Sequence, residues 1–533
     1  MQTLIPDSQT TASHASNRAL ASLIGKNTLF GVIANGVQIA TRLITVPVVI
    51  HHVGLDGYGI WSIIMVTAGY MRFGTAGIKS AFQKYVAEAT GTGDYKPANI
   101  LLSTGSISML LLSVAGLIPA AIFSGKLAGL FGVPLPFHAA ASASITVIAL
   151  TYAISNFGSA FEAIVMGGHR IDLTRKFNTI LTILEAGAII TLLNLGYGLL
   201  AMTFVMAASE LILVLCCYWA SHRVVPQMQV SLSHFKFSAF PELIRYAGSY
   251  QMVNTLELAY GAVVPLVLLK FFGATTAGIF AVASRLVTSA LIAQDALILP
   301  ILSGGALVFA SRELAQIRVF LAKAFKMALA LTIPPLALVS AFGPTMVMAW
   351  TGQTAPEFMR VICLTAIAGQ FRAISLLQLV LYRATGRALL DNIRQVLRIV
   401  VILIVARFQN TLGFEGVLAG MAVAELIGVI FMFFAMSSTF RGFSIKILTQ
   451  DTLRILGATL LLVTAGAFAA KVPLPWRMTD RIEAFERLAK IGIACLIVSW
   501  PAVLLTKALS GAERQTLLLA FLPGRKRGLL ANK

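Results

Sequence analysis

The chain has 533 residues, of which 58% are hydrophobic and only 12% are charged, and its mean hydropathy is +0.85. Soluble domains contain about 45–50% apolar and about 25% charged residues, so this composition excludes a soluble enzyme, a fibrous protein and a disordered chain. The net charge of +20 would suggest nucleic acid as the partner of a soluble protein. In a membrane protein it instead indicates basic cytoplasmic loops, and no nucleic-acid partner is expected.

Fourteen apolar stretches are long enough to cross a bilayer as helices, which takes about 20 residues each. Residues 1–22 precede them and are rich in Ser, Thr and Ala, so we expect a disordered cytoplasmic tail without a cleaved secretory signal. The predicted spans are 27–50, 58–78, 98–123, 140–165, 177–195, 198–220, 247–269, 274–299, 324–348, 361–382, 392–409, 415–437, 453–470 and 488–508. The expected fold class is therefore an all-α integral membrane protein with 14 transmembrane helices.

The distribution of Lys and Arg among the connections predicts the orientation, because cytoplasmic loops are enriched in basic residues. If the amino terminus is inside, 29 of the 41 Lys and Arg residues fall in cytoplasmic segments and nine in outside segments. This alternation favours an even number of spans with both termini in the cytoplasm.

Two charged segments near the carboxyl terminus need a separate interpretation. Residues 471–490 hold five of the nine outside basic residues, and Ile482, Phe485 and Ala489 fall on one helical face. We therefore expect an amphipathic helix at the membrane interface there. Residues 511–533 form a basic cytoplasmic tail, which we expect to contact anionic membrane lipids.

The chain contains an internal repeat with a period near 219 residues. The segment from Gly54 to Trp61 opens the second span, and the segment from Gly273 to Phe280 opens the eighth with the same glycine spacing. Three further matches follow in the same order, namely Gly168 with Gly386, Gly196 with Gly413, and Glu210 with Glu425. Four matches with a slowly drifting offset indicate a duplication of six helices.

Six is an even number, so both halves enter the membrane in the same orientation and are related by an axis along the membrane normal. We expect an N-lobe over residues 23–222 and a C-lobe over 223–440, followed by two appended spans over 441–510. Two such lobes predict a central cavity and alternating access by rocking of the lobes. The alternative is a duplication kept only for stability.

Four arginines in or near spans are candidate ligands for a phosphate. A charged residue inside a span costs roughly 2.5–3.5 kcal/mol on insertion scales and usually faces a water-filled cavity or a partner. Guanidinium groups bind phosphate oxygens through two parallel hydrogen bonds, so the fitting ligand is a diphosphate. The four are Arg42, Arg72, Arg285 and Arg372. The alternative is that each arginine pairs with a carboxylate.

Four acidic residues in the spans are candidates for ion coupling, because buried carboxylates can carry a proton or help to bind Na⁺. They are Glu210, Glu257, Asp295 and Glu425. Glu210 and Glu425 occupy matching positions of the repeat. The alternative is that they form hydrogen bonds between helices.

No motif for catalysis, metal binding or ATP binding is evident. The four cysteines lie inside apolar runs, and the seven histidines have no partner at the spacing of a zinc site. No Gly-rich loop ends in Gly-Lys-Ser/Thr, so we expect no direct use of ATP and no bound cofactor. Transport would then depend on an H⁺ or Na⁺ gradient or on the membrane potential, and we do not expect an enzyme.

Several loose motifs together resemble the polysaccharide-transporter and O-antigen flippase family. They lie at the two ends of the second span, at the start of the seventh, in the eighth, at the end of the ninth and just after the tenth. They are GLDGYGIW from Gly54, Arg72 followed by GIKSAF from Gly77, Tyr246 with Gly248, ASRL from Ala283, PILS from Pro300, Trp350 with Gly352, and Gly386. Many family members have an acidic residue before the glycine at the end of span two, whereas Met71, Arg72 and Phe73 precede Gly74 here.

The resemblance implies transport of a polyprenyl-diphosphate-linked oligosaccharide from the cytoplasmic to the periplasmic leaflet of a bacterial inner membrane. The pathway would be surface polysaccharide, lipopolysaccharide or exopolysaccharide biosynthesis, with a polymerase and glycosyltransferases as candidate partners. By position, Arg42, Arg72 and Arg285 are similar to the cationic cavity residues of the related lipid II flippases. The alternative within the superfamily is an ion-coupled antiporter of small organic molecules, of the multidrug and toxin extrusion type.

Overall fold

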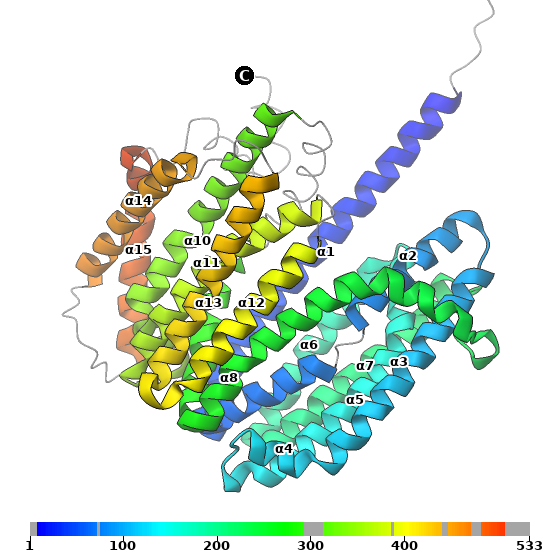
Figure 1. Ribbon diagram of the computed structural model, residues 1–533, viewed down its shortest axis with the longest axis horizontal. Coiled ribbons are helices and arrows are strands. Elements are labelled where there is room, and N and C mark those ends of the chain that lie inside the picture. Colours follow the sequence, from blue (N-terminus) through cyan, green and yellow to red (C-terminus); the bar gives the residue numbers. More distant parts are fainter. Residues whose placement is uncertain are drawn as a thin grey trace, which may run out of the picture. The chain divides into compact units, whose positions relative to one another are not determined.

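The structure is a computed structural model that describes residues 8–71, 75–292, 294, 313–384, 388–439, 446–470 and 481–506. Every element in these ranges is a helix, which confirms the predicted all-α class (Figure 1). The first unit, Met1–Gly278, and the second, Ile279–Lys533, are each compact. These units are defined by contacts and the expected lobes by the repeat, so the lobe boundary between residues 222 and 223 stays a prediction.

The helices of the first half overlap all eight spans predicted there, and the first and last helices each join two of them. They are α1 (Ser8–Met71), α2 (Thr75–Thr92), α3 (Lys96–Ile122), α4 (Ser124–Leu130), α5 (Leu135–Gly167), α6 (Ile171–Asn194), α7 (Leu199–Val224), the short 3₁₀ helices η1 (Leu232–His234) and η2 (Phe237–Ala239), and α8 (Phe240–Ala290). The second half continues with α10 (Leu314–Thr351), α11 (Glu357–Ala384), α12 (Ala388–Arg407), α13 (Gln409–Thr439), α14 (Lys446–Ala470) and α15 (Arg481–Thr506).

Ten stretches of described helix are long and apolar enough to cross a membrane. Two of them, Gly36–Gly69 and Thr255–Ala290, each contain parts of two predicted spans, so the ten stretches account for twelve of the fourteen. The remaining two predicted spans lie in α12 and α15, which are helical as expected but carry more charge. The chain is therefore a multi-pass membrane protein by the length and composition of its helices.

The repeat is visible in the backbone at two pairs of glycines. Gly54 has φ 71° and ψ 176° where α1 kinks, and Gly273 has φ 88° and ψ 172° where α8 kinks. The second pair, Gly196 and Gly413, has φ values of 87° and 65°. Positive φ is readily adopted only by glycine, so the matched residues mark the same turn in each half.

The amino-terminal segment and the start of α15 differ from the sequence-based expectation. α1 begins at Ser8, so residues 8–22 are helical where composition predicts a disordered tail. Extending an existing helix needs no new nucleus, and Ala favours it. The expected interfacial helix over 471–490 is not a separate element in its described part, because residues 481–490 are the first turns of α15. Its face with Ile482 and Phe485 is exposed, by 75% and 55%, while Ala484 is buried against the end of α10.

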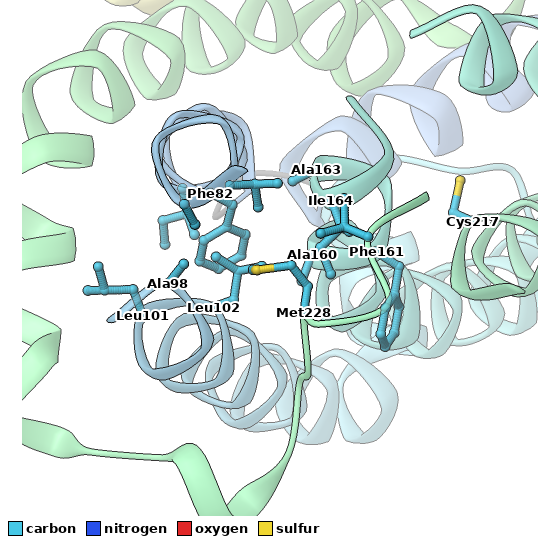
Figure 2. Packing of buried hydrophobic residues seen from close by; sticks show 14 of the residues in the cluster. Phe82, Ala98, Leu101, Leu102, Ala160, Phe161, Ala163, Ile164, Cys217 and Met228 are labelled. Carbon is cyan, nitrogen blue, oxygen red and sulfur yellow. The ribbon is translucent and has the colours of Figure 1, made fainter. Parts of the chain in front are cut away.

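The core of the first unit lies where α2, α3, α5 and α7 meet. Phe82 of α2 and Leu102 of α3 are fully buried there, together with Ile164 of α5 and Cys217 of α7 (Figure 2). Met228, from the connection after α7, reaches in between Leu102 and Ala160. The connection is therefore part of this core.

A polar ladder on α3 holds the connection between α7 and α8, residues 225–239, along the helix. Asn99 donates to the carbonyl of Gln227 at 3.2 Å and accepts from the amide of Gln229 at 2.9 Å. Ser103 accepts from the amide of Ser231 at 3.1 Å and donates to the Gln229 carbonyl at 3.3 Å. Thr104 pairs in the same way with both backbone groups of Lys236, at 3.0 and 3.2 Å. Side chains here satisfy backbone groups that have no sheet or helix partner.

Replacing Asn99, Ser103 and Thr104 together by alanine should therefore lower stability. Each side chain contributes on the order of 1 kcal/mol through its hydrogen bonds, so we expect a loss of about 3 kcal/mol. The measurement is thermal unfolding in one detergent. The control is Thr179→Ala on α6, because that hydroxyl donates to the Arg175 carbonyl of its own helix. A triple variant as stable as this control would show that the ladder does not hold the connection.

In the second unit, α13 packs against α11 and α12, and α14 and α15 pack against each other and against α10. Arg481, at the start of α15, donates to the carbonyls of Ala349 and Trp350 at 2.9 and 2.7 Å. Those carbonyls lie in the last turn of α10, where the helix has no further amides to bond them. The appended pair of helices is thus fixed to the rest of the unit by a cap as well as by apolar packing.

Candidate substrate and ion sites

Three of the four predicted cationic residues lie inside apolar helices with their side chains exposed. Arg42 is in the first unit on α1, whereas Arg285 on α8 and Arg372 on α11 are in the second. Each lies within one of the ten apolar stretches. Because an exposed guanidinium is costly in hydrocarbon, these positions favour contact with water or an anionic ligand. Their convergence on one cavity stays a prediction.

Two predicted site residues lie outside the described residues. Arg72 follows the last residue of α1, and Asp295 follows the last described residue of the eighth span. The roles assigned to them from sequence stay predictions.

A pair of carboxylates lies among α5, α6 and α7 in the first unit. Glu210 of α7 accepts a hydrogen bond from Ser155 of α5 at 3.2 Å. Glu185 of α6 is hydrogen-bonded by Ser209 and interacts electrostatically with Glu210. Two carboxylates that interact in this way repel each other when both are ionised. The sequence indicated Glu210 as an ion-coupling residue, and the structure adds Glu185 beside it.

Glu425, the repeat counterpart of Glu210, has a different environment. It is ion-paired with Arg398 of α12, and the two side chains are only 3% and 0% exposed. Arg398 also donates to Gln395, and Arg394 one turn earlier pairs with Asp391 at 2.8 Å. A guanidinium already neutralises Glu425, so this site gives the carboxylate a structural partner. Glu257 is half-buried on α8, and its expected coupling role stays a prediction.

The burial of two arginines on α12 was not predicted from sequence. Arg394 and Arg398 lie in the predicted span 392–409, and both are almost fully buried. They face Gly428 of α13, where an added Cβ would lie 3.4 Å from the side chain of Arg394 and 3.3 Å from that of Arg398. The four-residue spacing of the two arginines, with Asp391 three residues before the first, was the available signal.

The hairpin tips of the two repeat halves pack against each other within the first unit. A Cβ added at Gly278 would overlap the carbonyl oxygen of Leu55, and one at Gly59 would lie 2.7 Å from the amide nitrogen of Gly278. Thr275 donates to Asp56 at 2.6 Å beside this contact. Gly59 and Gly278 are 219 residues apart, and so are Asp56 and Thr275. The contact therefore joins equivalent residues of the two repeat halves. Only glycine allows two helices to approach so closely.

The described residues contain no group of three or more His, Cys, Asp and Glu side chains that could hold a metal ion. The four cysteines are free thiols, in agreement with their positions inside apolar runs.

No family model and no curated protein matches this chain. Several solved structures are similar to it. Lipid II flippase MurJ, in an inward closed conformation, is similar with a TM-score of 0.70 and 15% identity, over 89% of this chain and 99% of that chain. A multidrug resistance MATE family transporter of the MOP superfamily, in an inward-facing conformation, has a TM-score of 0.59 and 16% identity over 78% of this chain and 96% of that chain.

A third similar structure is a MOP superfamily transporter from Pyrococcus furiosus with a binding pocket of reversed polarity. Its TM-score is 0.54, with 16% identity over 78% of this chain and 96% of that chain. Identities this low establish the fold and leave the substrate open. The chain therefore has the all-helical membrane fold that lipid II flippase MurJ and the MATE transporters share, as the sequence resemblance predicted.

Proposed function

We propose that the protein is a flippase that moves a polyprenyl-diphosphate-linked oligosaccharide from the cytoplasmic to the periplasmic leaflet of a bacterial inner membrane. The observation that carries the proposal is the presence of exposed arginines within apolar helices, at Arg42, Arg285 and Arg372. With Arg72, they would bind the diphosphate. A cationic lining attracts an anionic lipid and disfavours the cationic substrates of many multidrug antiporters.

The extent of the structural likeness also supports a flippase. Similarity to MurJ covers 89% of the chain, and similarity to the MATE transporter covers 78%. The larger share covered by the similarity to MurJ fits this chain, because α14 and α15 follow the twelve spans of the repeat. A lipid-linked substrate fits such a flippase.

Arg285→Ala should abolish most of the export of surface polysaccharide and cause the lipid-linked precursor to accumulate. Loss of a bidentate phosphate contact should lower export at least about tenfold, because charge-assisted hydrogen bonds are worth roughly 1.5–3 kcal/mol. The measurement is mass spectrometry of lipid extracts from a deletion strain carrying each variant. Arg285→Lys should retain part of the activity, and the exposed Arg407, at the end of α12, serves as the control for loss of one charge. Full export by Arg285→Ala at normal protein level would remove Arg285 from the site.

An antiporter of small organic molecules is the second candidate, and the Glu185–Glu210 pair favours it. Two carboxylates that interact electrostatically within apolar helices are suited to exchange a proton or Na⁺ for a substrate. A drug-efflux assay in a pump-deficient strain separates the two functions. Drug resistance that depends on Glu210, without precursor accumulation in the deletion strain, would favour the antiporter.

The energy source in either case would be an H⁺ or Na⁺ gradient or the membrane potential, with Glu210 and Glu257 as the candidate coupling residues. Asp295 stays a candidate from sequence, and Glu425 already has an arginine partner. The candidate partners are a polysaccharide polymerase and glycosyltransferases on the pathway that supplies the glycan. Both termini would lie in the cytoplasm.

A further inference from the structure

The last turns of α7 combine an exposed apolar face with an aromatic and basic end. Ile212, Leu215 and Trp219 follow each other at helical spacing and are 45%, 65% and 55% exposed. Arg223, one turn further on, is also exposed. In a membrane protein such a face meets acyl chains, and its aromatic and basic end meets the headgroup region.

The side chains at this end are arranged by contacts within the first unit. The guanidinium carbon of Arg223 lies 3.8 Å from the centre of the Trp219 ring. Tyr218, on the adjacent face, packs edge-on against Phe161 of α5 at 5.0 Å and against His222 at 4.7 Å. The core residue Phe161 thus fixes Tyr218, and the Arg223–Trp219 stack projects outward beside it.

Stacking leaves the hydrogen-bonding edge of Arg223 available. The flat face of a guanidinium contacts the indole, while its N–H donors point outward in the plane of the group. Among the residues that the structure describes, no carboxylate lies within ion-pair distance of Arg223. Arg170, at the start of the neighbouring helix, differs because it is paired with Asp172 at 3.0 Å. Arg223 is therefore an exposed, uncompensated cation above an apolar face.

We propose that this surface, formed by Ile212, Leu215, Trp219 and Arg223, binds the headgroup of an anionic phospholipid. Arg223 would hold the phosphate through two N–H donors, the indole would lie at the glycerol level, and the acyl chains would run along Leu215 and Ile212. The arrangement matches a lipid in both charge and polarity, since the cation is at the end of the apolar face. α6, which packs beside α7, also exposes apolar side chains, namely Ile180, Ile183 and Leu184, by 55%, 53% and 62%. It shares no residue with the transport site proposed above.

Quenching of Trp219 by brominated lipids tests the proposal. The full-length protein is placed in nanodiscs containing brominated phosphatidylglycerol or brominated phosphatidylcholine at equal content, and Trp219→Phe supplies the background of the other tryptophans. We expect Trp219 to prefer phosphatidylglycerol about fivefold, as expected for one basic residue near an anionic surface. Arg223→Gln should reduce this preference to below about twofold.

Arg170→Gln is the matched control, because it removes the same positive charge from a guanidinium that is already paired. It should keep the preference of the wild type. Equal quenching by the two lipids, or an equal loss in Arg170→Gln, would overturn the proposal. Displacement of phosphatidylglycerol by micromolar geranyl diphosphate would also overturn it and assign the surface to a prenyl diphosphate instead.

Discussion

Arg398→Met should destabilise the second unit by roughly 3–5 kcal/mol, because it leaves the Glu425 carboxylate buried without its partner. Both side chains are almost fully buried, so water cannot replace the lost ion pair. The double variant Arg398→Met/Glu425→Leu should recover most of the stability, since well-packed apolar residues often replace a buried pair without loss. The measurement is the midpoint of thermal unfolding for the two single variants and the double variant.

The control for this cycle is an exposed pair at the start of α15. Lys490 lies 2.7 Å from Glu486, with both side chains more than half exposed. Solvent screens such pairs, so Lys490→Ala should leave the unfolding midpoint unchanged. If Arg398→Met behaves like Lys490→Ala, the pair does not hold α12 against α13. If the unfolding midpoint of the double variant is no higher than those of the single variants, lost packing rather than an unpaired buried charge explains the lower stability.

Gly278→Ala should impair both stability and transport. A methyl group there would overlap the carbonyl oxygen of Leu55, so the two hairpin tips would have to separate. Forced repacking of this kind costs typically about 1–3 kcal/mol, and the cost falls on the conformation in which the tips touch. We therefore expect a lower unfolding temperature and a transport rate reduced at least about tenfold.

Gly261→Ala is the matched control, because it lies on the same helix with nothing within 4 Å of an added Cβ. It should be neutral or slightly stabilising, as Ala favours a helix more than Gly does. Thermal unfolding and transport are measured for both variants in parallel. Equal behaviour of the two would show that the contact between the tips of the repeat halves has no role.

Much of the fold could be predicted from sequence, because long apolar runs specify membrane helices almost alone. The repeat could also be recognised from matching glycines. Gly54 and Gly273 both have positive φ, so the same turn requires glycine in each half. The helical start of α1 was not predicted. A polar composition indicates contact with water, but it does not exclude a helix that continues from the stable helix next to it.

The candidate site was less accessible to prediction. An arginine inside an apolar run, such as Arg42, can be recognised by its cost in hydrocarbon. Pairing is a property of distant segments, so neither the partnership of Arg398 with Glu425 nor that of Glu185 with Glu210 could be read along the chain. For the same reason, Asn99 and Ser103 look like ordinary polar residues of α3 until the connection is seen alongside them.

The most direct measurement is flipping in proteoliposomes that contain the purified protein and a polyprenyl-diphosphate-linked oligosaccharide. A sugar-modifying enzyme added outside reports how fast the glycan becomes accessible. The proposed function predicts that the wild-type protein accelerates this exposure, that Arg42→Ala and Arg285→Ala do not, and that Arg407→Ala behaves as the wild type. Transport of a small cationic drug with no acceleration of glycan exposure would contradict the proposal.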